Sequence, residues 1–328
     1  MRLRLQLLGG LTAAALGLIG LVAIYFTLAD RLIFPAFAQL APLFAALLVI
    51  LALIFAATRH VVRAGLCLVV AGAAFVSVIA RTERLMSDET VPAGATEMTL
   101  VSYNVMFRNA EIGAAVPEIT GSGADVVLLL EARALFSAMP ELAKAFPYRL
   151  GCDSEAACDS ALLSKWPLEA TRIGPLGAFA SERFLQARIA IGGTPVTVIG
   201  AHLSKPYFDA FAMSELNTLR HRIEGIGGPM VVAGDFNAPP WYWPLVRFAE
   251  RTGFRTARAF VPTWPTWSGP LGLPIDHVFA RSARVIDLKP LSSPYGSNHK
   301  GLIARIALLP GPGPAAAPAP AEPAPAGG

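Results

Sequence analysis

Three long apolar runs occupy most of the first 80 residues, where apolar positions show little alternation with polar ones. The runs cover Leu7–Ala29, Leu32–Ala57 and Ala64–Ala80, and none of them contains a charged side chain. A helix of about 20 apolar residues crosses the hydrocarbon core of a bilayer, and about 17 is the lower end of the range. The first run is also longer than the apolar part of a cleaved signal peptide. The pattern therefore predicts three transmembrane helices.

After residue 97, short apolar runs alternate with segments of helical periodicity. Strands are predicted at Met98–Tyr103, Asp125–Leu130, Ala161–Ser164, Leu185–Ile191, Val196–Ala201, Met230–Ala233, Ile275–Ala280 and Leu302–Leu308. Helices are predicted at Ala110–Ile119, Ala134–Ala145, Asp209–Ile226 and Trp241–Arg251. This mixture is typical of an α/β sandwich, in which two sheets pack together with helices outside.

Two further segments complete the predicted domain organisation. Residues 81–96 are polar and without periodicity, which predicts a linker. Residues 310–328 are nearly all Pro, Ala and Gly, a composition that cannot bury apolar area and is typical of a disordered tail. The expected division is a membrane domain at 1–80, the linker, a folded domain at 97–309 and the tail.

Composition agrees with this division. The chain is 54% hydrophobic and only 15% charged, with a mean hydropathy of +0.52, which excludes a uniformly soluble protein. Residues 97–309 hold 20 Lys and Arg against 18 Asp and Glu, a net charge of +2. So weak a basic excess gives no support for a dedicated duplex-binding surface.

The basic residues around the apolar runs predict an orientation. With the N-terminus in the cytoplasm, four arginines lie inside and three outside: Arg2, Arg4, Arg59 and Arg63 against Arg31, Arg81 and Arg84. Cytoplasmic loops carry the excess of Lys and Arg. Three spans then place the folded domain outside the cytoplasm, which is the periplasm in a bacterium with two membranes.

Two cysteines offer an independent indication of compartment. Cys152 and Cys158 are separated by five residues in a polar segment, and Cys67 lies in the third apolar run. A loop pair of this kind can form a disulfide in an oxidising compartment. Two unrelated free thiols are the alternative, and a metal site is less favoured because no second Cys or His pair accompanies them.

Polar side chains with catalytic chemistry cluster at the ends of the predicted strands. They are Asn104, Glu131, His202, Asp235, Asn237, Asp276, Asn298 and His299. A carboxylate at the end of a buried strand is costly to desolvate unless it is paired or binds a metal. Carboxylate and amide oxygens with imidazole nitrogens suit Mg²⁺ or Mn²⁺ better than zinc.

These residues lie in six short motifs whose order resembles that of the endonuclease/exonuclease/phosphatase family. The motifs are Ser-Tyr-Asn-Val (102–105), Leu-Leu-Glu (129–131), Gly-Ala-His-Leu (200–203), Gly-Asp-Phe-Asn (234–237), Ile-Asp-His (275–277) and Ser-Asn-His (297–299). The resemblance covers about 97–309 and implies a two-sheet, DNase I-like α/β sandwich. With three spans ahead of the domain, the layout is similar to the membrane-anchored bacterial branch of that family.

The resemblance also implies roles for individual residues. Glu131 would bind the metal, Mg²⁺ or Mn²⁺, with Asn104 beside it and Asn298 on the same side. Asp235 would orient or deprotonate the attacking water, and Asn237 would help to hold the phosphate. His202 and His299 would donate to phosphate oxygens, and Asp276 would orient His299.

The chain departs from the family pattern at two positions. Leu130 stands where the family usually has Gln, and Asn298 stands where it usually has Asp. The second change removes one negative charge from the metal side of the site. The leading hypothesis is a membrane-anchored, metal-dependent phosphodiesterase, and the alternative is a non-catalytic domain that binds phosphorylated ligands. The expected partners are a phosphate ester (nucleic acid or phospholipid headgroup) and the bilayer, with no obligate protein partner evident.

Overall fold

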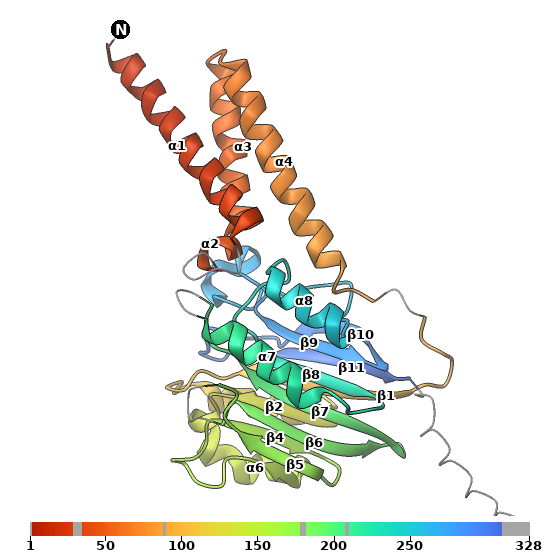
Figure 1. Ribbon diagram of the computed structural model, residues 1–328. Coiled ribbons are helices and arrows are strands. Elements are labelled where there is room, and N and C mark those ends of the chain that lie inside the picture. Colours follow the sequence, from red (N-terminus) through yellow and green to blue (C-terminus); the bar gives the residue numbers. More distant parts are fainter. Residues whose placement is uncertain (1, 29–34, 88–89, 178–181, 207–209, 310–328) are drawn as a thin grey trace, which may run out of the picture.

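Three long helices project from one end of an α/β domain in the computed structural model, which describes residues 2–28, 35–87, 90–177, 182–206 and 210–309 (Figure 1). The helices are α1 (Arg2–Thr27), α3 (Ala41–Ala57) and α4 (Val61–Glu83), and the short α2 (Pro35–Gln39) lies next to the domain. The start of the second apolar run, Arg31 and the predicted tail at 310–328 lie outside the described residues.

The prediction of three spanning helices is only partly upheld. By length and composition, two helices can cross a membrane, Arg4–Thr27 and Val61–Glu83, whereas the third apolar helix has only 17 residues. The second run is shortened because it breaks at Leu40 into α2 and α3. Pro42 stands in the first turn of α3, and proline cannot continue the hydrogen-bond ladder of a preceding helix.

The helical bundle is apolar on the outside as well as the inside. Small residues such as Ala45, Ala52 and Ala71 are buried where the helices meet. Large side chains face outwards, with Leu53 65% and Val69 70% exposed. In the most apolar 18-residue stretch of each helix, only 11% of the residues of α1 and 22% of those of α4 are buried. These helices are therefore not the core of a globular domain.

Two mixed sheets form the rest of the molecule. The first has the order β10-β11-β1-β2-β4-β3 and the second the order β5-β6-β7-β8-β9. The strands of the first sheet are β1 (Thr96–Asn104), β2 (Val126–Leu130), β3 (Tyr148–Leu150), β4 (Ser160–Ser164), β10 (Ala283–Pro290) and β11 (Leu302–Leu308). Those of the second are β5 (Glu169–Gly174), β6 (Phe184–Ile191), β7 (Thr194–His202), β8 (Met230–Asp235) and β9 (Asp276–Arg281).

All eight predicted strands and the four predicted helical segments are present. The helical segments are η1 (Ile112–Ala115) with α5 (Val116–Gly121), η2 (Ala132–Ala138) with α6 (Met139–Ala145), α7 (Phe211–Ile223) and α8 (Trp243–Thr252). The sequence pattern missed β3, β5 and β10. The strand β5 is exposed along almost its whole length, so it carries no alternation for a sequence pattern to reveal.

The sandwich contains three cores. The central core lies between the sheets and includes Leu128, Ile189 and Val198. A second core packs α7 and α8 on the outer face of one sheet, and a third packs α5, α6 and the 3-10 turns on the other. Gly200 permits the close approach of the sheets, because a Cβ there would lie 2.3 Å from Leu128 Cδ1. The predicted two-sheet α/β sandwich is therefore confirmed.

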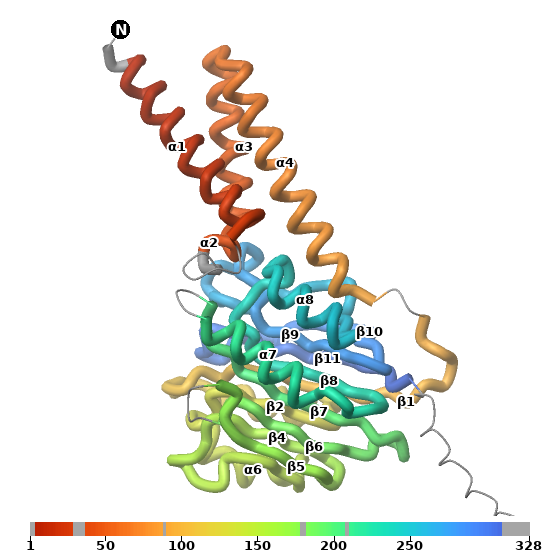
Figure 2. The backbone as a smooth tube through the Cα atoms, viewed as in Figure 1, coloured from red at the N-terminus to blue at the C-terminus, as the bar shows by residue number. Residues whose placement is uncertain are grey.

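The segment predicted as a linker makes extensive contacts with the domain. The helix α4 continues to Glu83, Leu85 is fully buried in the second core, and Met86 forms a bridge with Thr256. The helical bundle therefore runs directly into the folded domain, and Figure 2 shows the backbone passing from α4 towards β1 around the side of the sheets.

The helical bundle also contacts the domain at the segment that follows β8. The indole N–H of Trp241 donates to the carbonyl of Gln39 in α2 at 3.0 Å. The guanidinium groups of Arg81 and Arg84 lie over the ring of Trp243, at 5.4 and 5.6 Å. These contacts tie the helical bundle to the segment that leaves the candidate site.

Candidate active site

The predicted site residues meet at one edge of the two sheets. The strands β1 and β2 are parallel, as are β7 and β8, so the carboxyl ends of all four reach this edge. These ends carry Asn104, Glu131, His202 and Asp235. The strand β9 is antiparallel to β8, and its first residue, Asp276, pairs with Asp235. The topology thus gathers residues that are far apart in the sequence.

Special backbone conformations position two of the motifs. Gly234 has φ 138°, and a Cβ there would lie 2.0 Å from the carbonyl oxygen of Ala201, so only glycine fits before Asp235. Asn237 (φ 50°) and Glu131 (φ 52°) are both left-handed, a conformation uncommon for residues other than glycine and often found at functional sites.

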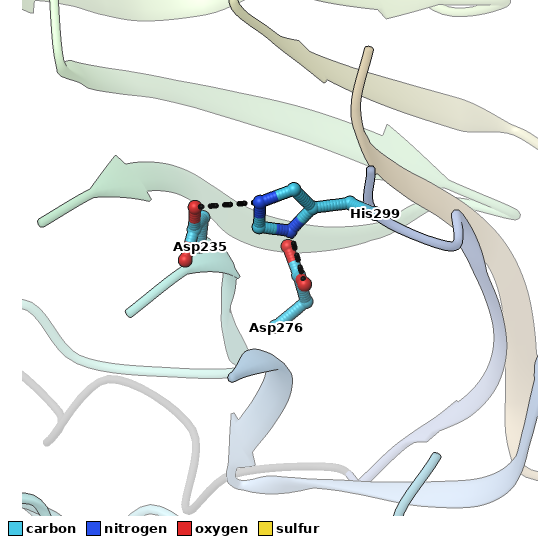
Figure 3. Close-up of side chains that lie close together, drawn as sticks. All are labelled: Asp235, Asp276 and His299. Atoms are coloured by element: carbon cyan, nitrogen blue, oxygen red, sulfur yellow. Dashed lines mark hydrogen bonds and ion pairs between the residues drawn. The ribbon is translucent and has the colours of Figure 1, made fainter. Parts of the chain in front are cut away.

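A buried chain of three side chains forms the centre of the site (Figure 3). The Nδ1 atom of His299 lies 2.8 Å from Asp276 Oδ2, and its Nε2 atom lies 3.7 Å from Asp235 Oδ2. Burial alone would lower the pKa of His299, but the carboxylates of Asp276 and Asp235 raise it to about 9. His299 is therefore an imidazolium at neutral pH, held by one carboxylate and facing another.

The opposite side of the site is formed by Glu131 and Asn104. The amide nitrogen of Asn104 donates to Glu131 Oε1 and to Asp235 Oδ2, each at 3.1 Å. The backbone N–H of Phe107 donates to Glu131 Oε2 at 2.9 Å. Burial opposes ionisation, yet these hydrogen bonds lower the pKa of Glu131, which is ionised at neutral pH.

His202 differs from His299 in its charge. Its Nε2 atom lies 3.7 Å from Asp235 Oδ2 and 4.0 Å from Glu131 Oε1, and its Nδ1 atom is buried without a hydrogen-bond partner. Burial lowers the pKa of His202 to about 4, despite the nearby Asp235 carboxylate. This histidine is neutral at pH 7 and can donate only one ring N–H.

Asn237 lies at the site, and one of its two amide N–H donors is already in use. Its side-chain nitrogen donates to the carbonyl of Leu203 at 2.8 Å, and its backbone N–H donates to Asp235 Oδ1 at 2.8 Å. Asn237 therefore braces the loop around Asp235.

Asn298 is not brought into this network. The residue is exposed, and among the described residues only its backbone carbonyl makes a hydrogen bond, with the N–H of Thr266 at 3.1 Å. The cysteine pair lies outside this network, in a segment that contacts the residues following Glu131, and Cys152 and Cys158 are joined in a disulfide.

Two supporting residues were not assigned a role from the sequence. The hydroxyl of Ser297 donates to the carbonyl of Asn104 at 2.8 Å and accepts the N–H of His299 at 3.0 Å. The hydroxyl of Thr263 accepts the backbone N–H of Asp276 at 3.3 Å. Ser297 belongs to a recognised motif, but Thr263 has no sequence signal of its own.

The donor set fits a hard divalent cation. Asp235, Asp276 and His299 have ligand atoms within 4.8 Å of one another. However, two of these three groups are already engaged with each other, because His299 Nδ1 lies 2.8 Å from Asp276 Oδ2. Glu131 is the more suitable ligand, because its carboxylate is ionised and its side chain is 29% exposed against 2% for Asp235. An accessible carboxylate can bind Mg²⁺ that keeps several of its waters.

Comparison with known proteins places this arrangement in a family. No curated protein matches the chain significantly. The sequence profile described as "Endonuclease/Exonuclease/phosphatase family" matches residues 101–299, which is more than half of the chain.

Solved structures share the fold. Humanized TDP2 of D. rerio is 14% identical, with a TM-score of 0.53, covering 64% of this chain and 98% of that one. The endonuclease/exonuclease/phosphatase of Bacteroides vulgatus is 15% identical, with a TM-score of 0.53, covering 65% and 99%. That of Beutenbergia cavernae is 17% identical, with a TM-score of 0.52, covering 65% and 72%. At these identities the likeness concerns the fold alone, but the sequence profile shows more: the chain belongs to the endonuclease/exonuclease/phosphatase family.

Proposed function

We propose that this chain is a membrane-anchored, divalent-metal-dependent phosphodiesterase that hydrolyses its substrate by attack of a water molecule. The observation that carries the proposal is the buried Asp276–His299 pair facing Asp235, with His299 Nε2 3.7 Å from the Asp235 carboxylate. A charged donor and a carboxylate acceptor side by side can stabilise a phosphate and activate water at the same place.

The roles of the individual residues follow from their protonation. Imidazolium His299 donates to a phosphate oxygen, and Asp276 holds the ring in the required orientation. Burial and the neighbouring Asp276 raise the pKa of Asp235, which makes this carboxylate a better proton acceptor than an exposed aspartate. Neutral His202 supplies a second ring N–H to the phosphate.

Glu131, with Asn104 beside it, would hold the metal. A bound Mg²⁺ neutralises charge on the phosphate and lowers the pKa of water. Asn298 remains a candidate on the metal side, where the missing carboxylate of the family would weaken the affinity for a hard cation.

Membrane anchoring is supported by the surface of the helical bundle. Side chains such as Leu53 and Val69 are largely exposed, and water-exposed apolar faces of this extent favour a lipid environment. The proposed orientation places the folded domain outside the cytoplasm and requires the 17-residue helix α3, at the lower end of the spanning length, to cross the bilayer as well. It also depends on the basic residues flanking the helices and on the disulfide.

The test is Mg²⁺-dependent hydrolysis of bis-p-nitrophenyl phosphate by the full chain in detergent micelles. His299→Gln should lower turnover by about 10²-fold or more, the usual range for a positioned proton donor. His221→Gln, an exposed histidine on α7, is the matched control and should retain activity. A folded protein without turnover across several divalent metals would instead favour the non-catalytic module that binds phosphorylated ligands.

The same assay identifies the class of substrate when it is repeated with natural phosphate esters. A D. rerio TDP2 structure contains a single-strand DNA product, so single-strand DNA belongs in the panel beside RNA, phospholipids and sugar phosphates.

A further inference from the structure

The two most exposed large apolar side chains among the described residues lie in one short segment. Trp267 is 86% exposed and Leu271 87%, and both belong to η3 (Thr266–Leu271), which is kinked at Gly269 between them. Single exposed apolar residues are normal on a protein surface. Two in the same short segment are less usual, and we call this pair the apolar tip.

The sequence around this tip also lacks charge. No Asp, Glu, Lys or Arg occurs in residues 259–275, and the one other uncharged stretch of similar length in the folded domain, 189–204, contains the largely buried strand β7. Charged residues make a surface loop that faces only water more soluble. In a segment that enters a bilayer, each charged residue makes insertion less favourable. The composition therefore favours a membrane contact for the η3 loop, which we define as residues 263–273.

The η3 loop is held in a defined shape. The backbone of Trp264 pairs with Leu273 in both directions, and the hydroxyl of Ser268 donates to the carbonyl of Pro265 at 2.7 Å. A loop that is ordered in advance can present Trp267 and Leu271 without a large entropic cost on binding.

The η3 loop also lies at the correct end of the molecule. Figure 1 shows the light-blue segment that contains it at the end of the domain from which α1, α3 and α4 project. If these helices cross the bilayer, α2 and the adjoining end of the domain lie at the membrane surface. Tryptophan is enriched at that depth, because its ring is apolar and its N–H is polar.

Hydrogen bonds connect the η3 loop directly to the candidate site. The N–H of Thr266 donates to the carbonyl of Asn298 at 3.1 Å, and its hydroxyl donates to the carbonyl of Ser297 at 3.2 Å. At the base of the loop, the hydroxyl of Thr263 accepts the N–H of Asp276. The loop thus braces both members of the Asp276–His299 pair, and its depth in a membrane determines the position of the site relative to lipid.

We propose that Trp267 and Leu271 enter the interfacial region of the bilayer, and that the site acts on the phosphate ester of a membrane lipid headgroup. This inference rests on the proposed phosphodiesterase function and narrows its substrate class. A lipid headgroup is presented at the surface that the η3 loop would reach, whereas a soluble substrate needs no apolar tip beside the site.

The experiment uses the full chain in lipid nanodiscs made of equal parts phosphatidylethanolamine and phosphatidylglycerol. The test variant is Trp267→Ala with Leu271→Ala. The control is Trp166→Ala, which replaces a tryptophan that is 42% exposed and follows the end of β4. The last residue of β4 pairs with the first residue of β2, so Trp166 lies at the opposite edge of the sheet from Glu131. Two activities are measured in the same nanodiscs, release of the phosphorylated headgroup and hydrolysis of added bis-p-nitrophenyl phosphate.

We expect the test variant to release headgroup about tenfold more slowly than the wild type, a change of ~1.4 kcal/mol in the activation barrier. Its hydrolysis of the soluble diester should stay within about twofold, since that reaction gains nothing from remote binding to the bilayer. The control should match the wild type in both assays. Equal headgroup release by the wild type and the test variant would overturn the proposal, as would a wild type that hydrolyses only the soluble diester.

A second measurement reports on the loop without requiring activity. Brominated acyl chains should quench tryptophan fluorescence less in Trp267→Phe than in the wild type, whereas Trp166→Phe should not change the quenching. An enzyme inactive on both substrates would refute the proposed function and the lipid substrate together. The quenching would still decide whether the η3 loop enters the bilayer, and identical quenching in Trp267→Phe and the wild type would show that it does not.

Discussion

Two buried histidines flank Asp235, and their partners leave His299 positively charged and His202 neutral at pH 7. His299 is hydrogen-bonded to Asp276, and the two nearby carboxylates outweigh burial, so its pKa rises to about 9. His202 has no comparable hydrogen bond to a carboxylate, and burial lowers its pKa to about 4. The site therefore holds one fixed positive charge and one neutral donor at pH 7, which suits a single anionic phosphate better than two imidazolium groups would.

Replacement of Glu131 with Gln tests the proposed metal ligand. A neutral amide is a poorer ligand for a hard cation, so Mg²⁺-dependent turnover should be lost while the fold is retained. Glu141→Gln, on the outside of α6, is the matched control and should behave as the wild type. Activity at different Mg²⁺ concentrations checks the expectation, and a Glu131→Gln enzyme with ordinary Mg²⁺ activation would contradict the assignment.

The sequence identified which residues matter better than it identified what each one contacts. Asn104, Glu131, His202, Asp235, Asp276 and His299 all stand at strand ends, so a strand prediction is enough to place them at one edge. Contacts that depend on packing could not be predicted in this way. The use of the Asn237 amide by Leu203 is one example, and the bracing of Asp276 by Thr263 is another.

Glu118 gives the segment leading to His299 a dependence on pH. Its carboxylate accepts the hydroxyl of Tyr295 and both the N–H and the hydroxyl of Ser292. Although burial opposes ionisation, these hydrogen bonds lower the pKa of Glu118. The stability that they contribute is therefore fully present above the unfolded pKa of about 4.3 and is lost as pH falls through the lower folded value.

The expected result is a melting temperature of the wild type that exceeds that of Glu118→Gln at pH 7. The difference should shrink as the pH is lowered below about 4, because both proteins then carry a neutral side chain at this position. A constant difference from pH 7 to pH 3 would show that the charge of Glu118 contributes nothing.

Among the larger elements, α4 extends further towards the domain than the sequence indicated. The polar residues after Ala80 indicated a linker, but Leu85 and Met86 join the domain through one buried side chain and one bridge. Such short contacts carry no periodicity. By contrast, the buried strands β2 and β8 are continuous apolar runs and were predicted within two residues of their ends.

Leu85→Ala should destabilise the folded domain by about 2–5 kcal/mol, the usual cost of truncating a fully buried leucine. Leu271→Ala removes the same group from an exposed position and should leave stability nearly unchanged. Urea denaturation of the full chain in detergent measures both variants. Equal stability of the two would indicate that residue 85 belongs to a free linker after all.

The disulfide between Cys152 and Cys158 is expected in protein isolated without reductant. It would stabilise the domain by ~2 kcal/mol in the loop-entropy model. Intact mass before and after alkylation provides the test, and two alkylated thiols in the unreduced, folded protein would rule the bond out. The loop also contains Glu155, which pairs with Arg133, two residues after Glu131, so reduction should loosen this side of the site.

At the scale of the whole molecule, the helices and the folded domain are joined at two places, Leu85–Met86 and Trp241–Trp243. This double connection fixes the direction of the site relative to the helices, so in the proposed membrane-anchored arrangement the orientation of the chain decides which compartment the site faces. An alkaline phosphatase fused after Gly94 should be active if the domain lies outside the cytoplasm. If the alkaline phosphatase fusion is inactive and a reporter that fluoresces only in the cytoplasm is fluorescent at the same position, the domain lies in the cytoplasm and the proposed orientation is wrong.

The position of β1 has a consequence for how the protein is made. This strand lies inside the first sheet, with β2 on one side and β11 on the other, and Thr96 pairs with Leu308. The central sheet therefore stays open until the ribosome has synthesised the whole domain, because its first and last strands are neighbours. Contacts so distant in the sequence form slowly. In the orientation proposed above, the domain must pass through a narrow translocation channel, and the delay would keep the chain extended during export until its final strand has arrived.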